Sequence, residues 1–192
     1  MKELARFAGA LADDGWLQID LEFEQPENLL EGIGFRLMHS PDRQILLTAN
    51  WRSTGASTSI ARLDTADLRA ALWHAEAVNL PAAVLLATTR AATGLQTGPG
   101  PTTRLRAAGW QQQPVIEISP GIKALGFIDP VGRRWAAAQR AYHSGRLHRG
   151  PWMISRDDLA PGDGLRAYAH TDADAPGSVI AALALTESEP GA

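Results

Sequence analysis

The clearest alternation of apolar and polar residues lies near the start of the chain. In residues 17–24, apolar side chains occupy every odd position and polar or acidic side chains occupy every even position. This period of two predicts a strand with one buried face and one wet face. The residues before it predict a helix that ends at Gly15. The apolar positions of that helix are Leu4, Phe7, Ala8 and Leu11.

Three further short strands are predicted in direct succession. Residues 33–38, 44–51 and 58–63 are rich in apolar residues, and turn signals at Pro41 and Gly55 separate them. No helical crossover fits between such closely spaced strands. The pattern therefore predicts an antiparallel meander rather than alternating strands and helices.

A longer helix is predicted over residues 64–79, with Asp64 as its N-cap and Pro81 just beyond its end. At about 100° per residue, Trp73 and Arg69 fall on the side opposite the apolar stripe. The next apolar run, residues 82–87, predicts a buried strand. The apolar stripe of the helix consists of Leu68, Ala71, Leu72, Ala75 and Val78.

The second half of the chain predicts a similar mixture of elements. Residues 91–104 are rich in Gly, Pro and Thr without periodicity, which predicts a flexible loop. We expect a helix at residues 133–144 and a disordered tail at residues 187–192. The remaining apolar runs predict strands at residues 115–118, 124–128, 152–154, 165–169 and 178–186.

Together these elements predict an α+β fold. A length of 192 residues suffices for one domain with a substantial core. We expect a single two-layer domain over residues 1–186, with helices packed on a mostly antiparallel β-meander sheet. The pattern predicts no internal repeat, and residues 91–104 are the one stretch suited to be a linker.

Composition narrows the available chemistry. The chain contains no cysteine, which excludes disulfides, a thiol nucleophile and thiolate metal sites. The apolar runs are too short for a signal peptide or a membrane span, so we expect a cytoplasmic protein without membrane contact. All but two of the 18 basic residues are Arg, and Ala is abundant, which is typical of a GC-rich bacterial genome.

Charge is distributed unevenly along the chain. Residues 1–50 contain nine acidic and four basic residues, whereas residues 90–149 contain nine basic and two acidic residues. The basic middle could be neutralised by the acidic ends within the fold, or it could face an anionic partner.

The Gly-rich loop in the basic stretch is a candidate anion site. Gly98 and Gly100 precede a possible short helix, a layout in which backbone amides can bind a phosphate. Residues 96–100 resemble the pyrophosphate loop of GNAT acyltransferases, but the stretch is one residue shorter and Pro99 lacks an amide donor. The alternative is a plain flexible loop. The arginines expected to neutralise an anionic ligand are Arg90, Arg104, Arg106, Arg133 and Arg140.

The same arginines are candidates for nucleic-acid binding. Aromatic residues are interleaved with them, as in proteins that stack bases. On a helix over residues 133–144, however, Trp135 and Tyr142 would face away from Arg133 and Arg140. The expected surface is then an arginine face for phosphates or acidic groups rather than a stacking platform.

Trp73 and Arg69 form the candidate site for a protein partner. An exposed Trp beside an Arg has the composition of an interface anchor. If a second element covers this side of the predicted helix, Trp73 is instead an ordinary core residue.

The histidines do not predict a metal site. His143 and His148 are the closest pair, and Gly145 between them breaks any helical alignment. Asp172 and Asp174 open a stretch similar to a calcium loop, but Leu183 stands where the closing Glu is required. We therefore expect no bound metal, and no motif in the sequence indicates which cofactor, if any, the protein binds.

The absence of a catalytic set favours a non-enzymatic bacterial binding or assembly protein that acts through a protein partner or self-association. One alternative is a small enzyme or regulator that binds an anionic ligand (phosphorylated, nucleotide or acyl-CoA) at the Gly-rich loop and arginine face. The other is a nucleic-acid-binding protein. Residues 1–90 resemble type III secretion chaperones in their predicted order of helix, strands and helix, a resemblance of topology.

Overall fold

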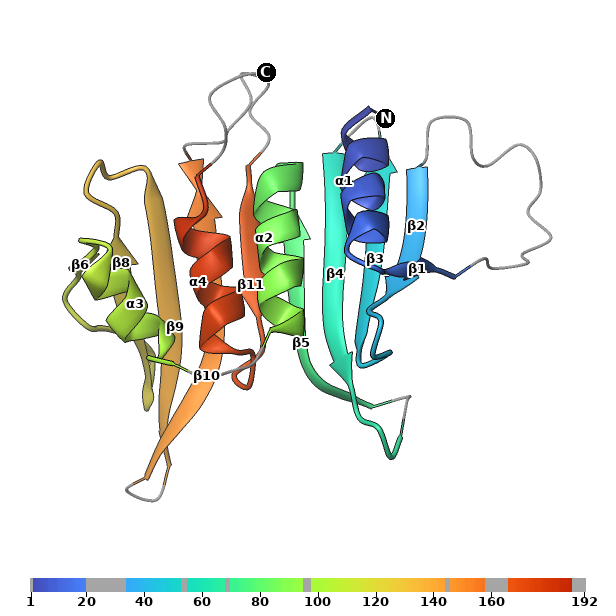
Figure 1. Ribbon diagram of the computed structural model, residues 1–192. Coiled ribbons are helices and arrows are strands. Elements are labelled where there is room, and N and C mark those ends of the chain that lie inside the picture. Colours follow the sequence, from blue (N-terminus) through green and yellow to red (C-terminus); the bar gives the residue numbers. More distant parts are fainter. Residues whose placement is uncertain are drawn as a thin grey trace.

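One antiparallel sheet of eleven strands dominates the computed structural model, and four helices complete the described part of the chain (Figure 1). The structure describes residues 2–19, 34–52, 55–67, 70–94, 98–143, 146–157 and 166–187. The helices are α1 (Lys2–Asp13), α2 (Ala82–Thr93), α3 (Pro101–Ala107) and α4 (Gly177–Leu185). The strands are β1 (Leu17–Gln18), β2 (Gly34–His39), β3 (Ile45–Arg52), β4 (Gly55–Leu63), β5 (Ala71–Val78), β6 (Gln111–Gln112), β7 (Ile116–Ser119), β8 (Ile122–Ile128), β9 (Arg134–His143), β10 (Arg146–Arg156) and β11 (Tyr168–Thr171).

The strand order divides the sheet into two meanders. The order is β1-β2-β3-β4-β5-β11-β10-β9-β8-β6, and β7 also pairs with β8. Each of these pairings is antiparallel. The two meanders meet where β5 pairs with β11. The mixed α/β class and the antiparallel sheet predicted from the sequence are thus confirmed.

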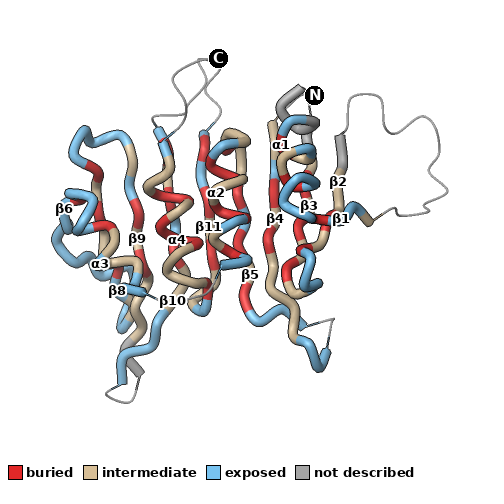
Figure 2. Tube along the Cα trace, in the orientation of Figure 1, coloured by how far each residue is buried: buried red, intermediate tan, exposed pale blue. Residues whose placement is uncertain are grey.

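The four helices lie side by side along one face of the sheet (Figure 1). The strands show this through alternate burial: in β3, Ile45, Leu47 and Ala49 are buried, whereas Leu46 and Thr48 between them are partly exposed. Figure 2 shows the same alternation of buried positions along the central strands. We call the side beneath the helices the helix face and the opposite side the open face.

Alanines on the helix face line the contact with α2 and α4. Because an alanine side chain is short, the larger apolar residues of a helix can pack closely above it. From α2 and α4, Val84, Leu85, Val179 and Leu183 enter this core. The buried alanines of the strands are Ala49, Ala75, Ala77, Ala136, Ala138 and Ala169.

Two segments predicted as helices are strands. The prediction of a helix over residues 64–79 is wrong, because residues 71–78 form β5 and place Trp73, Ala75 and Ala77 on the helix face. The prediction of a helix over residues 133–144 is also wrong, because this stretch forms β9. Both contain good helix formers, but pairing with strands on both sides overrides that local preference.

Two segments predicted as strands are helices. Residues 82–87 belong to α2, and residues 178–186 fall largely within α4. Both are apolar over most of their length, and a short apolar run cannot distinguish a buried helix from a buried strand. The predicted loop over residues 91–104 is also too long, because α2 continues to Thr93 and α3 begins at Pro101.

Most other predictions are confirmed or fall outside the described residues, but the buried face predicted for residues 17–24 is absent from β1, where Leu17 and Gln18 are both exposed. The strands over residues 44–51 and 58–63 are β3 and β4, and the pair over residues 115–118 and 124–128 corresponds to β7 and β8. Parts of four further predictions cannot be compared, because they lie outside the described ranges. These parts are residues 20–24, 33, 165 and 188–192.

The two halves of the chain repeat one order of elements, so the prediction of no internal repeat is wrong. Each half runs from a helix through a meander to a second helix. Ile60 lies opposite Ala75, and Ile154 lies opposite Ala169, so equivalent residues are 94 positions apart (60 to 154, 75 to 169). By the same shift Glu76 is equivalent to His170, and these two lie opposite each other in the β5–β11 pair. An approximate two-fold axis therefore passes through the centre of the sheet.

A short sequence repeat marks the same relation. Residues 11–18 and 105–112 share the pattern Leu-x-x-x-Gly-Trp-x-Gln, again with a spacing of 94 (11 to 105). The glycines, Gly15 and Gly109, have φ values of 82° and 80°, which L side chains rarely adopt. In each half the backbone N–H of the tryptophan donates to the backbone carbonyl of the leucine, at 2.9 Å in the first half and 3.0 Å in the second.

The turn before β3 is repeated in the turn before β9. Ser40 and Asp129 are both buried, and each accepts a hydrogen bond on its side-chain oxygen from the backbone N–H five residues later. The donors are Ile45 and Arg134, each at 3.0 Å. Equivalent residues in this turn and in the strand that follows are therefore 89 positions apart (40 to 129, 45 to 134).

Candidate functional site

Arg104 folds back over the Gly-rich loop at residues 98–100. Its Nε donates to the Pro99 carbonyl at 2.9 Å, and a Cβ added at Gly98 would lie 2.9 Å from its Nη2 atom. The helix that follows has seven residues and begins with Pro101, which has no N–H. An internal guanidinium therefore occupies the loop, and α3 contributes one amide fewer than a phosphate site at a helix start would use.

Two further arginines of the predicted anion site bind other parts of the chain. Arg90 on α2 donates two hydrogen bonds to the Asp14 carboxylate, at 2.7 and 3.0 Å. These bonds hold the pKa of Asp14 below its usual value. Arg106 on α3 donates to the side-chain oxygen of Gln112. Both arginines thus join elements of the fold.

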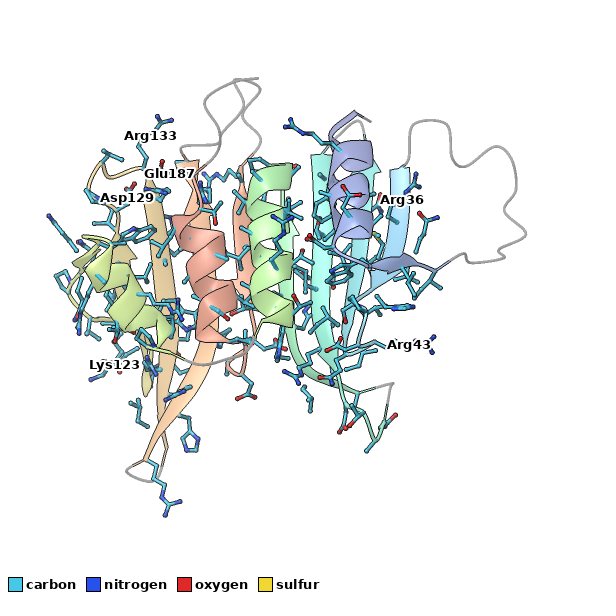
Figure 3. The ribbon with its side chains drawn as sticks, in the orientation of Figure 1. Arg36, Arg43, Lys123, Asp129, Arg133 and Glu187 are labelled. Atoms are coloured by element: carbon cyan, nitrogen blue, oxygen red, sulfur yellow. The ribbon has the colours of Figure 1, made fainter. Side chains whose placement is uncertain are left out.

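The predicted arginine face at residues 133–144 does not form, because these residues are not helical. Arg133 precedes β9 and donates to the Asp157 carbonyl at 3.3 Å. Arg140 lies further along β9, opposite Lys123 of β8. Figure 3 shows Arg133 and Lys123 at opposite ends of this part of the sheet. The structure therefore separates Arg133 from Arg140, whereas it places Arg140 in one row with Lys123 of β8 and Arg149 of β10.

Trp73 lies in the core, where only 4% of it is exposed. It stands on the helix face of β5, opposite Arg62 of β4. Of the two possibilities that the sequence left open, the structure shows the one in which another element covers Trp73. Arg69 lies outside the described residues.

The open face has an unusual composition at its centre. Charged side chains are expected on a solvated sheet face. Over the described central stretches of β3, β4, β5, β10 and β11, however, Glu76 is the one carboxylate and no Lys or Arg occurs; Asp172, whose N–H donates to the His74 carbonyl, borders this region just beyond β11. The register places these residues on the open face: Leu46, Thr48, Asn50, Ser57, Ser59, Ala61, Leu72, His74, Glu76, Val78, Met153, Ser155, Tyr168 and His170. We call this set the central zone.

The second-half side of this face is apolar. Tyr168 and Met153 are 46% and 44% exposed, and Trp135 on β9 is 39% exposed. Trp135 and Tyr168 both flank Ser155, so the two aromatic side chains lie two strands apart in one row. We call Trp135, Met153 and Tyr168 the apolar patch.

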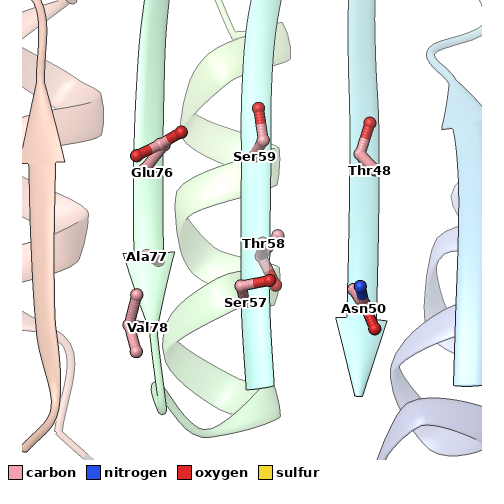
Figure 4. A pocket seen from close by; sticks show the side chains of 8 residues that line it. All are labelled: Thr48, Asn50, Ser57, Thr58, Ser59, Glu76, Ala77 and Val78. Carbon is pink, nitrogen blue, oxygen red and sulfur yellow. The ribbon is translucent and has the colours of Figure 1, made fainter. Parts of the chain in front are cut away.

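The first-half side carries a pocket of about 220 Å³ that is lined mostly by residues with polar side chains, although most of the surface they expose to it is apolar; we call it the polar pocket (Figure 4). Two rows of side chains form it: Thr48, Ser59 and Glu76 lie side by side across β3, β4 and β5, and Asn50 and Ser57 lie in the next row with Val78. The volume is below the 300–1,000 Å³ of ligand pockets for drug-sized molecules. The pocket is therefore suited to a single functional group or side chain.

Asn50 presents an unused hydrogen-bond acceptor in this pocket. Its Oδ1 atom is buried and has no hydrogen-bond partner in the described part of the chain. A buried acceptor without a partner destabilises the folded state by about 1–3 kcal/mol. A donor group in the pocket would remove this penalty once the Asn50 amide turns its oxygen toward it.

A hydrogen bond between Ser59 and His74 borders the pocket. Ser59 Oγ lies 2.6 Å from His74 Nε2, and the same nitrogen lies 4.0 Å from Glu76 Oε1. In a catalytic Ser-His-carboxylate triad the carboxylate binds the other ring nitrogen, Nδ1, and so orients the ring. Because serine and glutamate approach one nitrogen here, the arrangement supports binding rather than nucleophilic catalysis.

The described residues contain no cluster of three His, Asp or Glu side chains that could hold a metal ion. None of the helices in this part of the chain has both the length and the apolar character needed to cross a membrane.

The sequence pattern missed this pocket for a specific reason. It correctly assigned Thr48, Asn50 and Ser59 to strands, but it assigned Glu76 and His74 to a helix. The rows across β3, β4 and β5 could therefore not be assembled. The alternation of Trp73, Ala75 and Ala77 with polar residues was the available signal.

Comparison with known proteins finds no family model, no curated protein and no solved structure that matches the chain.

Proposed function

We propose that the chain is a non-enzymatic bacterial binding or assembly protein whose open face contacts a protein partner. In this proposal residues 1–186 are a cytoplasmic two-layer domain, with helices on one face of the sheet and the partner on the other. The observation that supports it is the central zone, where charge is nearly absent, together with the apolar patch beside it.

This composition is typical of the centre of a protein interface. Interface cores are depleted of charged residues and enriched in Tyr, Trp and Met. The residues whose truncation lowers binding affinity most are commonly Trp and Tyr, and residues that contribute little to the binding free energy surround them. On this chain Trp135 and Tyr168 have that setting, with Ser155 between them.

The dimensions also suit a protein contact. The pocket and the patch lie on six neighbouring strands, β3, β4, β5, β11, β10 and β9. At about 4.8 Å between strands these span roughly 24 Å. A standard interface covers about 800 Å² on each partner, a patch roughly 30 Å across.

The anionic-ligand and nucleic-acid hypotheses receive less support, from one short row of basic residues: Lys123, Arg140 and Arg149 across β8, β9 and β10. Both need several arginines on one surface, which would also make binding fall steeply with salt. Arg90, Arg104 and Arg106 contact separate internal groups, and Arg133 and Arg140 lie apart along β9. We therefore retain the protein-binding hypothesis.

The proposal predicts which surface a partner needs. The double variant Trp135→Ser/Tyr168→Ser is expected to lose at least tenfold in affinity for the partner, because each hot-spot aromatic contributes roughly 2 kcal/mol. Val131→Ser is the matched control, because Val131 is 72% exposed in the turn between β8 and β9. Each protein is used to isolate partners from extracts of its own cells, and recovered proteins are quantified by mass spectrometry.

The partner is defined as a protein that wild type and Val131→Ser retain and the double variant loses. If the double variant retains every protein that the wild type binds, the open face is not the contact surface. Circular dichroism of each variant shows whether a loss reflects misfolding.

A further inference from the structure

We propose that the polar pocket binds a guanidinium side chain of the protein partner. The pocket residues are Thr48, Asn50, Ser57, Ser59 and Glu76. This inference rests on the proposed function and names the chemistry that one half of the open face recognises. The partner segment would place an arginine in the pocket and apolar side chains on the apolar patch.

The pocket offers acceptors to a donor-rich group. Asn50 Oδ1 is buried without a partner in the described part of the chain. The Glu76 side chain is 63% exposed, and within the described residues its one ion pair is with His74, at 4.0 Å. Two unused acceptors of this kind, one carrying a full negative charge, favour a cation with several N–H groups.

The spacing of these acceptors favours guanidinium over ammonium. Asn50 lies on β3 and Glu76 on β5, two strand spacings across the sheet and two residues along it, so their Cα atoms are about 12 Å apart and their side chains must lean toward each other to bind one group. Serine and threonine hydroxyls lie between them. A guanidinium carries five N–H donors in one plane and can address several separated acceptors at once, whereas an ammonium group is a compact point charge.

The internal repeat shows that the fold itself does not require this polar set. At the equivalent positions of the second half, Met153 replaces Ser59 and His170 replaces Glu76 (59 to 153, 76 to 170). On the strand equivalent to β3, Ala137 replaces Thr48 and Gln139 replaces Asn50 (48 to 137, 50 to 139). One geometry thus carries a uniformly polar set in one half and a mixed set, with Ala137 and Met153 beside Gln139 and His170, in the other. The difference points to recognition of two chemically different parts of one partner.

Charge supports a cationic occupant at this place. Glu76 is the single carboxylate of the central zone, and no Lys or Arg of that zone offsets its charge; its nearest basic side chains are His74, at 4.0 Å, and His170, which lies opposite it in the β5–β11 pair. An arginine docked here would pair with a carboxylate that the fold does not neutralise with a Lys or Arg of the described residues. Removal of water from the interface on docking strengthens such a pair.

The test titrates the ¹⁵N-labelled full chain with Nα-acetyl-arginine amide and, separately, with Nα-acetyl-citrulline amide, a neutral isostere. We expect the arginine probe to shift backbone and side-chain amide signals of β3, β4 and β5, with millimolar affinity. Citrulline should produce little change. Glu76→Gln should weaken arginine binding at least tenfold, and the matched control Glu117→Gln, on β7, should leave it unchanged.

Asn50→Val separates a binding role from a structural one. It should weaken arginine binding while unfolding at the same or a higher denaturant concentration than wild type, because the residue has an acceptor that the described fold does not use. Equal shifts with citrulline, shifts confined to other surfaces, absence of shifts, or an unchanged affinity in Glu76→Gln would overturn the inference.

The outcomes also separate this inference from the proposed function. If arginine fails to bind but Trp135→Ser/Tyr168→Ser still loses a protein partner, the guanidinium assignment is wrong and the contact surface stands. If arginine binds the pocket but the double variant loses no partner, the pocket serves a free small molecule and the proposed function is wrong.

Discussion

Asp129→Ala is expected to lower the free energy of unfolding by about 3–5 kcal/mol, the usual effect of removing one partner from a buried ion pair. The Asp129 side chain is fully buried, and its Oδ2 accepts from Arg134 Nε at 2.9 Å. Its Oδ1 also accepts from the backbone N–H groups of Arg133 and Arg134. The variant therefore leaves two backbone N–H groups and one guanidinium without their acceptor.

Urea unfolding of Asp129→Ala, Asp174→Ala and Ser40→Ala measures this effect. Asp174 is an exposed acid and should give a change near zero. Ser40 is itself uncharged, accepts from Ile45 N–H and donates to the Asp42 carboxylate, so Ser40→Ala should lose about 1–3 kcal/mol. For a chain of this size the Asp129 effect corresponds to a melting temperature lower by roughly 10 °C or more. A loss below about 1 kcal/mol in Asp129→Ala would contradict the assignment of a buried ion pair.

The contribution of Asp129 should also depend on pH. Burial by itself raises the pKa of Asp129, but hydrogen bonds from Arg134 and from the Arg133 backbone outweigh it and hold the pKa below its usual value. A carboxylate with a lowered pKa in the folded state stabilises above the unfolded pKa of about 4, and this stabilisation is lost as the pH falls through the folded pKa. The difference in stability between wild type and Asp129→Ala should therefore narrow below about pH 4.

Trp16→Ala and Trp110→Ala should each destabilise the protein by about 3–5 kcal/mol, because each removes a large side chain from the core. The two residues hold equivalent positions in the repeat, and each is only 4% exposed. Trp110 has one additional contact, because the Arg134 guanidinium lies 5.6 Å from its ring centroid. The loss should therefore be somewhat larger for Trp110→Ala than for Trp16→Ala.

Double variants test the contacts of Arg134 with Trp110 and Asp129, and milder substitutions at the tryptophans keep the chain folded. Trp110→Phe and Asp129→Ala both alter the surroundings of Arg134, so their effects should not be additive. Trp16→Phe lies in the other half and should add to Asp129→Ala within about 0.5 kcal/mol. The opposite pattern of additivity in urea unfolding would show that the contacts around Arg134 are assigned wrongly.

The sequence predicted strands well where apolar and polar residues alternate and failed where alanine is common. In β5 and β9 the buried positions are largely Ala, a good helix former, and this produced a helical pattern in place of a strand. Those alanines lie beneath α2 and α4, a contact between segments far apart in the chain that local propensity does not contain. The α4 segment was predicted as a strand because it is apolar on nearly every side, so its sequence has no helical periodicity.

The same errors in secondary structure prevented prediction of the candidate site. Asn50 and Ser59 were placed on strands, but the pocket requires their alignment with Glu76, which depends on the register of three strands. The number of arginines in the basic stretch led to the prediction of an anion-binding surface, whereas the structure gives several of them internal partners such as Asp14 and Asp129. The internal repeat was present in the sequence around Trp16 and Trp110, but it spans only eight residues in each half.

The central claim is that the open face, and not the helix side, contacts a protein partner. Site-specific photo-cross-linking in the protein's own cells tests this most directly, with p-benzoylphenylalanine placed either at Tyr168 or at Ala83. Tyr168 lies on the open face, and Ala83 is an exposed residue of α2 on the helix side. We expect a cross-linked protein adduct from position 168 and none from position 83. An adduct from position 83, with none from position 168, would contradict the proposed contact surface.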